Sequence, residues 1–261
     1  MPPPPDNHTA GCAAALAAIG AAAALLRALR LGDAKTRWFA LHALVNFAVS
    51  AFGWSDLRFV MGRPSLSMTA EMQSWVPSYL SFSVHLYHLL EGMATGDGVR
   101  AEDLAHHLIF VGVFAVVNFA FAWGPIVNVL LFFITGAPGG INYCLLVLRK
   151  EGRLSALRQK ELYRSIDVWF RMPGLVCVSC IMVSNAIEGR IRVPMAAALG
   201  CALLSSLNGI FYMQQAVVSL ERSRYGEATN TTPENEEEEE EEEKKNKRAS
   251  REIIDNVPRL L

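Results

Sequence analysis

The chain has 261 residues, of which 52% are hydrophobic and only 19% are charged, and its mean hydropathy is +0.24. Residues 226–261 hold 12 acidic and 6 basic side chains, whereas residues 1–225 hold 13 acidic and 18 basic ones. The apolar stretches between the basic clusters are too long and too frequent for the core helices of a small soluble domain. This composition excludes a soluble enzyme domain, a coiled coil and a nucleic-acid-binding module. It predicts an all-α, multi-pass membrane protein.

Hydropathy predicts about seven membrane-spanning helices. They lie near residues 10–26, 38–54, 75–90, 105–123, 125–148, 168–187 and 193–218. A secretory signal peptide carries basic residues before its apolar run, but here Arg27 and Arg30 follow the run. We therefore interpret residues 1–32 as an N-terminal tail with a first transmembrane anchor, and residues 33–225 as a six-span membrane domain.

The Lys and Arg residues near the predicted spans indicate the orientation. One face of the membrane would receive 14 of them and the other face 4. Because cytosolic loops are enriched in Lys and Arg, the richer face is predicted to be cytosolic. This places the C-terminus in the cytosol.

Residues 226–261 form the predicted cytosolic tail. Glu236 to Glu243 is an unbroken run of eight glutamates, followed by a short basic cluster. Such a block repels itself and buries no apolar surface, so we expect it to be disordered.

Histidines converge on the predicted cytosolic half of the membrane. They are His42, His85, His88, His106 and His107. Ionisable side chains inside spans are costly and are functional candidates by default. Asp103 precedes the last two by three and four residues, so its carboxylate could orient an imidazole and raise its basicity.

Other polar residues extend these histidines into stripes at helical spacing. One stripe is Ser74, Ser78, Ser81, His85, His88 and Glu91; a second is His42, Asn46 and Ser50; and Asn118 lies three turns beyond His107. We expect the stripes to face a shared interior. The alternative interpretation is structural: Ser and Asn often join membrane helices, and a histidine near a helix end can reach the interface.

The same residues disfavour several other types of site. Three histidines with Asp103 could hold one zinc ion, but the sequence has no zinc-protease motif such as H-E-x-x-H. We therefore predict neither a metal nor a bound cofactor. The chain also lacks the G-x-S-x-G motif of serine hydrolases and a phosphate-binding loop. A seven-helix receptor is disfavoured because no lumenal cysteine pair is present.

Two further features stand out in the later spans. The segment Thr135 to Gly140 (T-G-A-P-G-G) is expected to break the fifth span, leaving either a site of close helix packing or an opening for a lipid chain. Arg171 is expected at the cytosolic interface, where it would suit a phosphate or another anionic head group.

These residues resemble the TLC domain family, which includes ceramide synthases and several lipid-homeostasis proteins. The resemblance covers roughly residues 33–225 and rests on Trp38 to Asn46 (W-F-A-L-H-A-L-V-N), on Asp103-Leu104-Ala105-His106-His107, and on the spacing to Gln215. It implies a six-helix membrane barrel with a cavity for an acyl chain. In ceramide synthases the adjacent histidines, which match His106 and His107, serve acyl transfer from acyl-CoA. Where synthases carry a second His-Asp, this chain has Thr135 to Gly140 and Asn142, so it looks like the non-synthase branch.

The sequence therefore predicts a membrane protein that binds or handles lipid and influences membrane lipid composition. The expected partners are membrane lipids or fatty acyl chains, not nucleic acid, and a homodimer is compatible with the sequence. The residues expected to contact lipid are His42, Asn46, His85, His88, Asn118 and Arg171. We expect the endoplasmic reticulum or another endomembrane, with the plasma membrane as the alternative.

Two alternatives to this function remain. One is an acyl-CoA-dependent N-acyltransferase, with His106, His107 and Asp103 as its catalytic residues and acyl-CoA as its substrate. The other is a trafficking adaptor that uses the acidic tail. We favour the non-enzymatic function.

Overall fold

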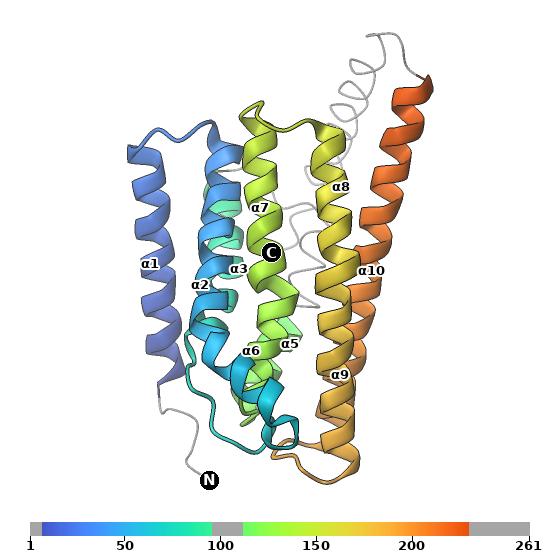
Figure 1. The fold of residues 1–261 in the computed structure, drawn as a ribbon. Coiled ribbons are helices and arrows are strands. Elements are labelled where there is room, and N and C mark those ends of the chain that lie inside the picture. Colours follow the sequence, from blue (N-terminus) through green and yellow to red (C-terminus); the bar gives the residue numbers. More distant parts are fainter. Residues whose placement is uncertain (1–6, 96–111, 230–261) are drawn as a thin grey trace, which may run out of the picture. The chain divides into compact units, whose positions relative to one another are not determined.

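The computed structural model describes residues 7–95 and 112–229, and in these ranges the chain forms helices and loops without a strand. The all-α prediction is confirmed. The chain divides into two units, Met1–Val217 and Val218–Leu261. Figure 1 shows the helices of the first unit running side by side, with their connections at two ends. The helices are α1 (His8–Ala28), α2 (Ala34–Gly62), α3 (Val76–Thr95), α5 (Val113–Ala120), α6 (Ile126–Leu131), α7 (Ala137–Lys150), α8 (Ala156–Ile166), α9 (Met172–Ile187) and α10 (Met195–Thr229), with a short 3-10 helix at Pro64–Leu66.

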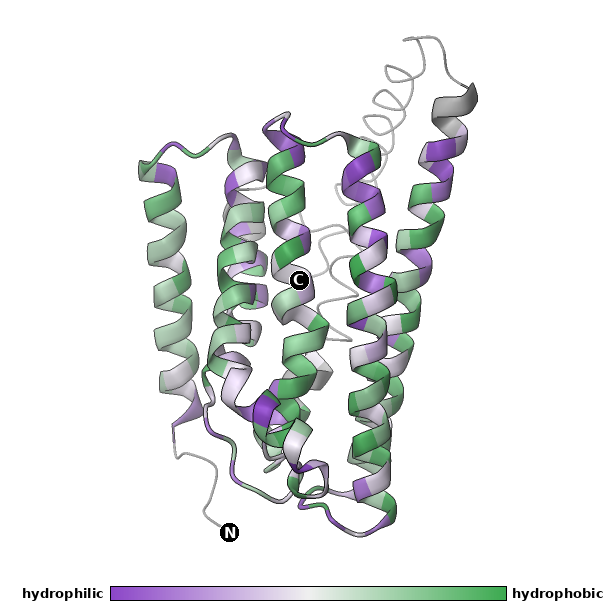
Figure 2. Cartoon of the chain, viewed as in Figure 1, coloured by the Kyte–Doolittle hydropathy of each residue, from purple (hydrophilic) through white to green (hydrophobic). Residues whose placement is uncertain are grey.

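Four helices in the described part of the chain are long and apolar enough to cross a membrane. They are His8–Ala28, Ile126–Lys150, Ala156–Ile187 and Met195–Tyr225. The remaining helices α2, α3 and α5 coincide with predicted spans, but they are shorter, less apolar or only partly described, so seven spans stay a prediction. Figure 2 shows apolar residues along the middle of the helices and polar residues towards their ends.

Local capping explains where several helices begin. The side chain of Asn7 accepts from Ala10 N–H at 2.9 Å at the start of α1, and Ser155 accepts from Arg158 N–H at 3.2 Å before α8. Asp33 begins α2 by accepting from Thr36 N–H at 2.6 Å. The hydrogen bonds from Thr36 lower the pKa of the Asp33 carboxyl. These signals are local, so the sequence alone accounts for these boundaries.

The expectation that Thr135 to Gly140 breaks the fifth span is wrong. The helix continues from α6 through a π-helical turn, Phe132–Gly136, into α7. Pro138 has no N–H to donate to the preceding turn, and the wider turn accommodates this loss. A second π-helical turn, Asp167–Arg171, joins α8 to α9 immediately before Pro173.

The glycines after the first π-helical turn allow α7 to pack closely on α2. A Cβ on Gly136 would lie 2.6 Å from Ser50 Oγ, and one on Gly140 would lie 2.9 Å from the Phe47 ring. A Cβ on Gly139 would lie 2.7 Å from Asn46 Nδ2. Close helix packing, one of the two interpretations of this segment, is therefore present, and Thr135 and Gly139 of the same segment also line a cavity described below.

A network of buried polar side chains fixes the loop between α2 and α3. We call Asp56, Asn128 and Asn185 the polar clasp. Asp56 accepts from Gln73 N–H at 3.0 Å and from Asn128 Nδ2 at 2.5 Å, and the same nitrogen donates to Ser74 O at 2.7 Å. From α9, Asn185 Nδ2 donates to Pro64 O at 2.9 Å. The clasp thus ties the loop to α2, α6 and α9.

Apolar packing completes the first unit. One cluster joins α2, α6, α9 and α10 and includes Val60, Ile126, Leu175 and Met182. A smaller cluster joins α1, α2 and α3 around Ile19 and Leu41. In the second unit the end of α10 carries the ion pair of Arg224 with Glu221 at 3.3 Å.

Candidate ligand-binding cavity

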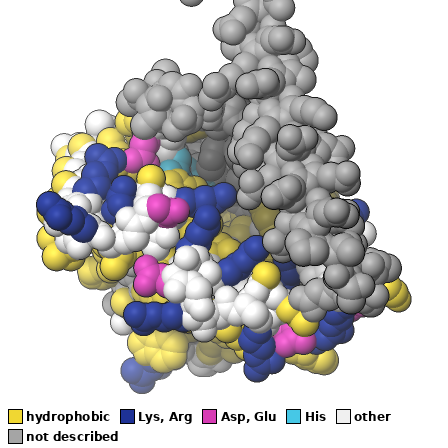
Figure 3. All heavy atoms as spheres, turned by 90° about the horizontal axis from the view of Figure 1, so that it is seen from above, with side chains coloured by type: hydrophobic (Ala, Val, Ile, Leu, Met, Phe, Trp, Pro, Cys, Tyr) yellow, Lys and Arg dark blue, Asp and Glu magenta, His cyan; other side chains and the backbone are white. Residues whose placement is uncertain are grey.

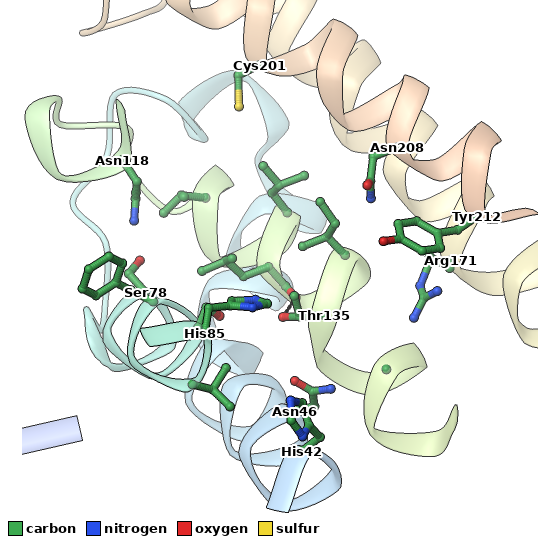
Figure 4. A pocket seen from close by; sticks show the side chains of 18 of the residues that line it. His42, Asn46, Ser78, His85, Asn118, Thr135, Arg171, Cys201, Asn208 and Tyr212 are labelled. Atoms are coloured by element: carbon green, nitrogen blue, oxygen red, sulfur yellow. Dashed lines mark hydrogen bonds between the residues drawn. The ribbon is translucent and has the colours of Figure 1, made fainter. Parts of the chain in front are cut away.

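A cavity of about 270 Å³ lies among the helices of the first unit. All of its described lining residues lie between His42 and Tyr212. Its polar lining residues are His42, Asn46, Ser78, Ser81, His85, Asn118, Thr135, Asn142, Tyr143, Tyr163, Arg171, Asn208 and Tyr212. The volume is near the lower end of the range for small-molecule sites. Figure 4 shows labelled side chains from several helices pointing into this space.

The cavity lining changes in character along the helices. The stretch from α5 into α6 contributes apolar side chains, including Val117, Trp123 and Ile126, and α9 adds Met182 near its end. Further along, the π-helical turn and α7 contribute Thr135 and Asn142. Ser78 and Asn118 are exceptions, because they are polar residues at the apolar end. The lining therefore suits a molecule with an apolar body and a polar group.

The polar end of the cavity faces the basic end of the helices. The connection from α1 to α2 carries Arg30, between Arg27 on α1 and Lys35 on α2. The last turn of α7 carries Arg149 and Lys150, and the connection to α8 carries Arg153. Figure 3 looks onto this end, where Lys and Arg side chains gather around the described surface. The polar lining is thus on the side that the charge distribution predicts to be cytosolic.

The structure brings most of the predicted lipid-contacting residues together. His42, Asn46, His85, Asn118 and Arg171 all line the cavity. His88 is not among the lining residues and lies behind His42, to which it is hydrogen-bonded. His106, His107 and Asp103 lie outside the described residues. Parts of the stripes of α2 and α3 thus meet at one cavity, with Ser78 and Ser81 beside His85, whereas Ser50, Ser74, His88 and Glu91 of the same stripes are not among the lining residues.

Hydrogen bonds with Trp38 assign the tautomers of His42 and His88. The carbonyl of Trp38 can only accept, so His42 Nδ1, 2.8 Å away, carries a proton. The indole Nε1 of Trp38 donates to His88 Nδ1 at 2.8 Å, so the proton of neutral His88 is on Nε2, which donates to His42 Nε2. The rings are nearly parallel, at 2°. Both ring nitrogens of His42 are thus engaged within the protein, so His42 presents its ring to the cavity and is not suited to act as a base.

Arg171 is paired inside the protein. It is 7% exposed, and its Nη1 lies 2.8 Å from Asp167 Oδ1 on the preceding turn. Tyr163, one turn earlier, interacts electrostatically with both. Arg171 is therefore buried at the cavity instead of exposed at an interface, and Asp167 compensates its charge. The spacing of four residues between Tyr163, Asp167 and Arg171 was the available sequence signal.

Several buried polar atoms at the cavity have no hydrogen-bond partner among the described residues. They are Ser78 Oγ, Ser81 Oγ, Asn118 Oδ1, Asn142 Oδ1 and Arg171 Nε. Buried polar groups in folded proteins nearly always have a partner, and an unpartnered one costs about 1–3 kcal/mol. A ligand with a polar group would supply partners to these atoms.

No cluster of three or more His, Cys, Asp or Glu side chains suited to a metal occurs in residues 7–95 and 112–229. The zinc alternative depended on His106, His107 and Asp103, outside those ranges. The described site offers hydrogen bonds and apolar contacts.

The chain matches no protein-family model, and no curated protein or solved structure matches it. Fold and site together define an all-helical, membrane-associated protein with an internal cavity. The resemblance to the TLC domain family stays a prediction that rests on the quoted residues.

Proposed function

We propose that this protein is a multi-pass membrane protein that binds a lipid in the cavity and thereby influences membrane lipid composition. The observation that carries the proposal is the cavity lining, which is apolar towards α5 and α6 and polar towards α7. A lipid has the same division between acyl chain and head group. The unpartnered Asn142 Oδ1 and Arg171 Nε at the polar end add support, because a head group would satisfy them.

The proposed architecture has more membrane spans than the four apolar helices. Helices α2, α3 and α5 also cross the membrane, so that seven spans result and six of them form a TLC-type barrel. The basic end lies in the cytosol of an endomembrane, in accordance with the positive-inside rule. The acyltransferase alternative depends on His106 and His107, which lie outside the described residues, and no observation favours it.

Lipid copurification tests the central claim. The protein is purified from membranes in mild detergent, and bound lipid is quantified by native mass spectrometry. Ile134→Trp places a large side chain at the cavity lining, and Leu207→Trp places the same side chain at a 50% exposed position on α10. We expect Ile134→Trp to lose most of the bound lipid while wild type and Leu207→Trp retain it. Equal lipid in the two variants, both folded by circular dichroism, would contradict the proposal.

Glycosylation mapping tests the orientation separately. A glycosylation sequon in an added loop is inserted after Gly189, between α9 and α10, or after Gly152, between α7 and α8. We expect modification only of the insertion after Gly189, because that connection lies at the end opposite the basic residues. Modification only of the insertion after Gly152 would show that the protein has the opposite orientation in the membrane.

A further inference from the structure

The charge of the cavity lining is balanced. Arg171 is the one lysine, arginine or acidic residue in the described lining. It forms an ion pair with Asp167, which is not itself a lining residue. The side chains of the pair are only 9% and 1% exposed, so bulk water screens them little. Of the two histidines in the described lining, His42 has been assigned a neutral tautomer and adds no charge.

This balance disfavours a charged head group. A carboxylate or phosphate at Arg171 would also approach Asp167, and the arginine already shares its charge with that carboxylate. An ammonium group would approach Arg171 instead. In a low-dielectric site an uncompensated charge is costly, and like charges placed together cost several kcal/mol. An uncharged head group avoids both costs.

The unpartnered atoms require both a donor and an acceptor from the ligand. Arg171 Nε can only donate, whereas Asn142 Oδ1 can only accept. The two flank Gly139: Arg171 Nη2 lies 3.8 Å from the Cβ position of Gly139, and Asn142 is one turn further along α7. A hydroxyl or amide can accept from the first and donate to the second, whereas a carboxylate can only accept.

We propose that the cavity selects amphiphiles whose head group is uncharged and both donates and accepts hydrogen bonds, as an alcohol or a primary or secondary amide does. This inference rests on the proposed function, because it assumes that a lipid occupies the cavity. It also replaces the anionic ligand that the sequence suggested for Arg171.

Three amphiphiles with matched alkyl chains test the selectivity: monopalmitoylglycerol, palmitate and hexadecylamine. Their binding to the delipidated full-length protein is measured at neutral pH by displacement of a fluorescent lipid. Wild type should bind monopalmitoylglycerol about tenfold or more tighter than either charged ligand, which corresponds to about 1.4 kcal/mol. Asp167→Asn leaves Arg171 uncompensated and should shift the preference to palmitate. The double variant Asp167→Asn/Arg171→Gln is neutral again and should restore the preference for monopalmitoylglycerol.

A wild-type preference for palmitate or hexadecylamine would overturn the inference, as would a folded Asp167→Asn variant with unchanged ranking. If Asp167→Asn does not fold, the wild-type ranking decides. Binding of all three ligands with equal affinity, sensitive to Ile134→Trp, would reject the selectivity but keep the lipid-binding function. Failure of wild type to bind any lipid would reject the proposed function itself.

Discussion

The polar clasp and the cavity both place polar side chains inside the first unit, but they differ in how these groups are satisfied. In the clasp both carboxylate oxygens of Asp56 accept hydrogen bonds, and the amide nitrogens of Asn128 and Asn185 donate to the loop; only the two amide oxygens lack partners. At the cavity, the hydroxyls of Ser78 and Ser81 have no partner among the described residues.

The comparison distinguishes buried polar groups that stabilise the fold from buried polar groups that a ligand could bind. A buried polar group that is bonded within the protein fixes the fold, and its loss leaves a partner unsatisfied. A buried polar group that lacks a partner costs stability, and at a cavity a ligand can supply the missing bond. Removal of a side chain should therefore destabilise the protein at the clasp but not at the cavity.

The largest effect is expected for Asp56→Ala. Asp56 is fully buried, and its removal leaves Asn128 Nδ2 and Gln73 N–H without this acceptor. The free energy of unfolding should fall by about 2–4 kcal/mol. Denaturant titration in detergent measures it, with Asp56→Asn, which keeps one acceptor, as the milder control. A loss below that of an exposed substitution would show that the clasp does not hold the loop.

Gly139→Ala tests the close approach of α7 to α2 at the edge of the cavity. The added methyl group would lie 2.7 Å from Asn46 Nδ2, and overpacking of this kind costs about 1–3 kcal/mol. Gly200→Ala on α10 is the matched control, because its Cβ would meet nothing within 4 Å. There the change should stabilise the helix by about 0.5–1 kcal/mol. Opposite shifts of the melting temperature are expected, and shifts of equal sign would contradict the packing.

Ser78→Ala removes an unpartnered hydroxyl at the cavity. Ser78 is buried, yet the free energy of unfolding should stay the same or rise by up to about 1 kcal/mol, because no bond is lost. Denaturant titration in detergent measures this change beside that of Asp56→Ala. A destabilisation as large as that of Asp56→Ala would remove the distinction between the two regions.

Arg27→Ala should cause the smallest loss of stability among the variants that remove a hydrogen bond or ion pair. Its ion pair with Glu91 joins α1 to α3 at 2.6 Å, but the arginine side chain is 60% exposed. Exposed pairs contribute about 0.2–1 kcal/mol, and salt screens them. The loss in unfolding free energy should therefore shrink further at high ionic strength. A salt-independent loss above that range would contradict this prediction, because it would show that Arg27 holds α1 by more than an exposed ion pair.

Particular residues show how far the sequence could predict the site. Helical spacing correctly placed His42 with Asn46, and Ser78 with Ser81 and His85, on stripes that line one cavity. It did not identify the bond between His88 and His42, which are 46 positions apart, or that between Asp56 and Asn128, 72 positions apart. Periodicity indicates which face of a helix a residue occupies, but the rotation and height of the neighbouring helix decide which residue it contacts.

The sequence by itself determined the helical class, the apolar segments and the basic end, because hydropathy, helix propensity and capping act over a few neighbouring residues. The tertiary structure alone decided that Arg171 pairs with Asp167 next to the cavity, that α7 continues through Pro138, and that Asn128 closes the clasp. The physical reason is that burial and pairing depend on the packing of separate helices. The free-energy cost of a buried charge depends on which groups the packing of the helices places beside it.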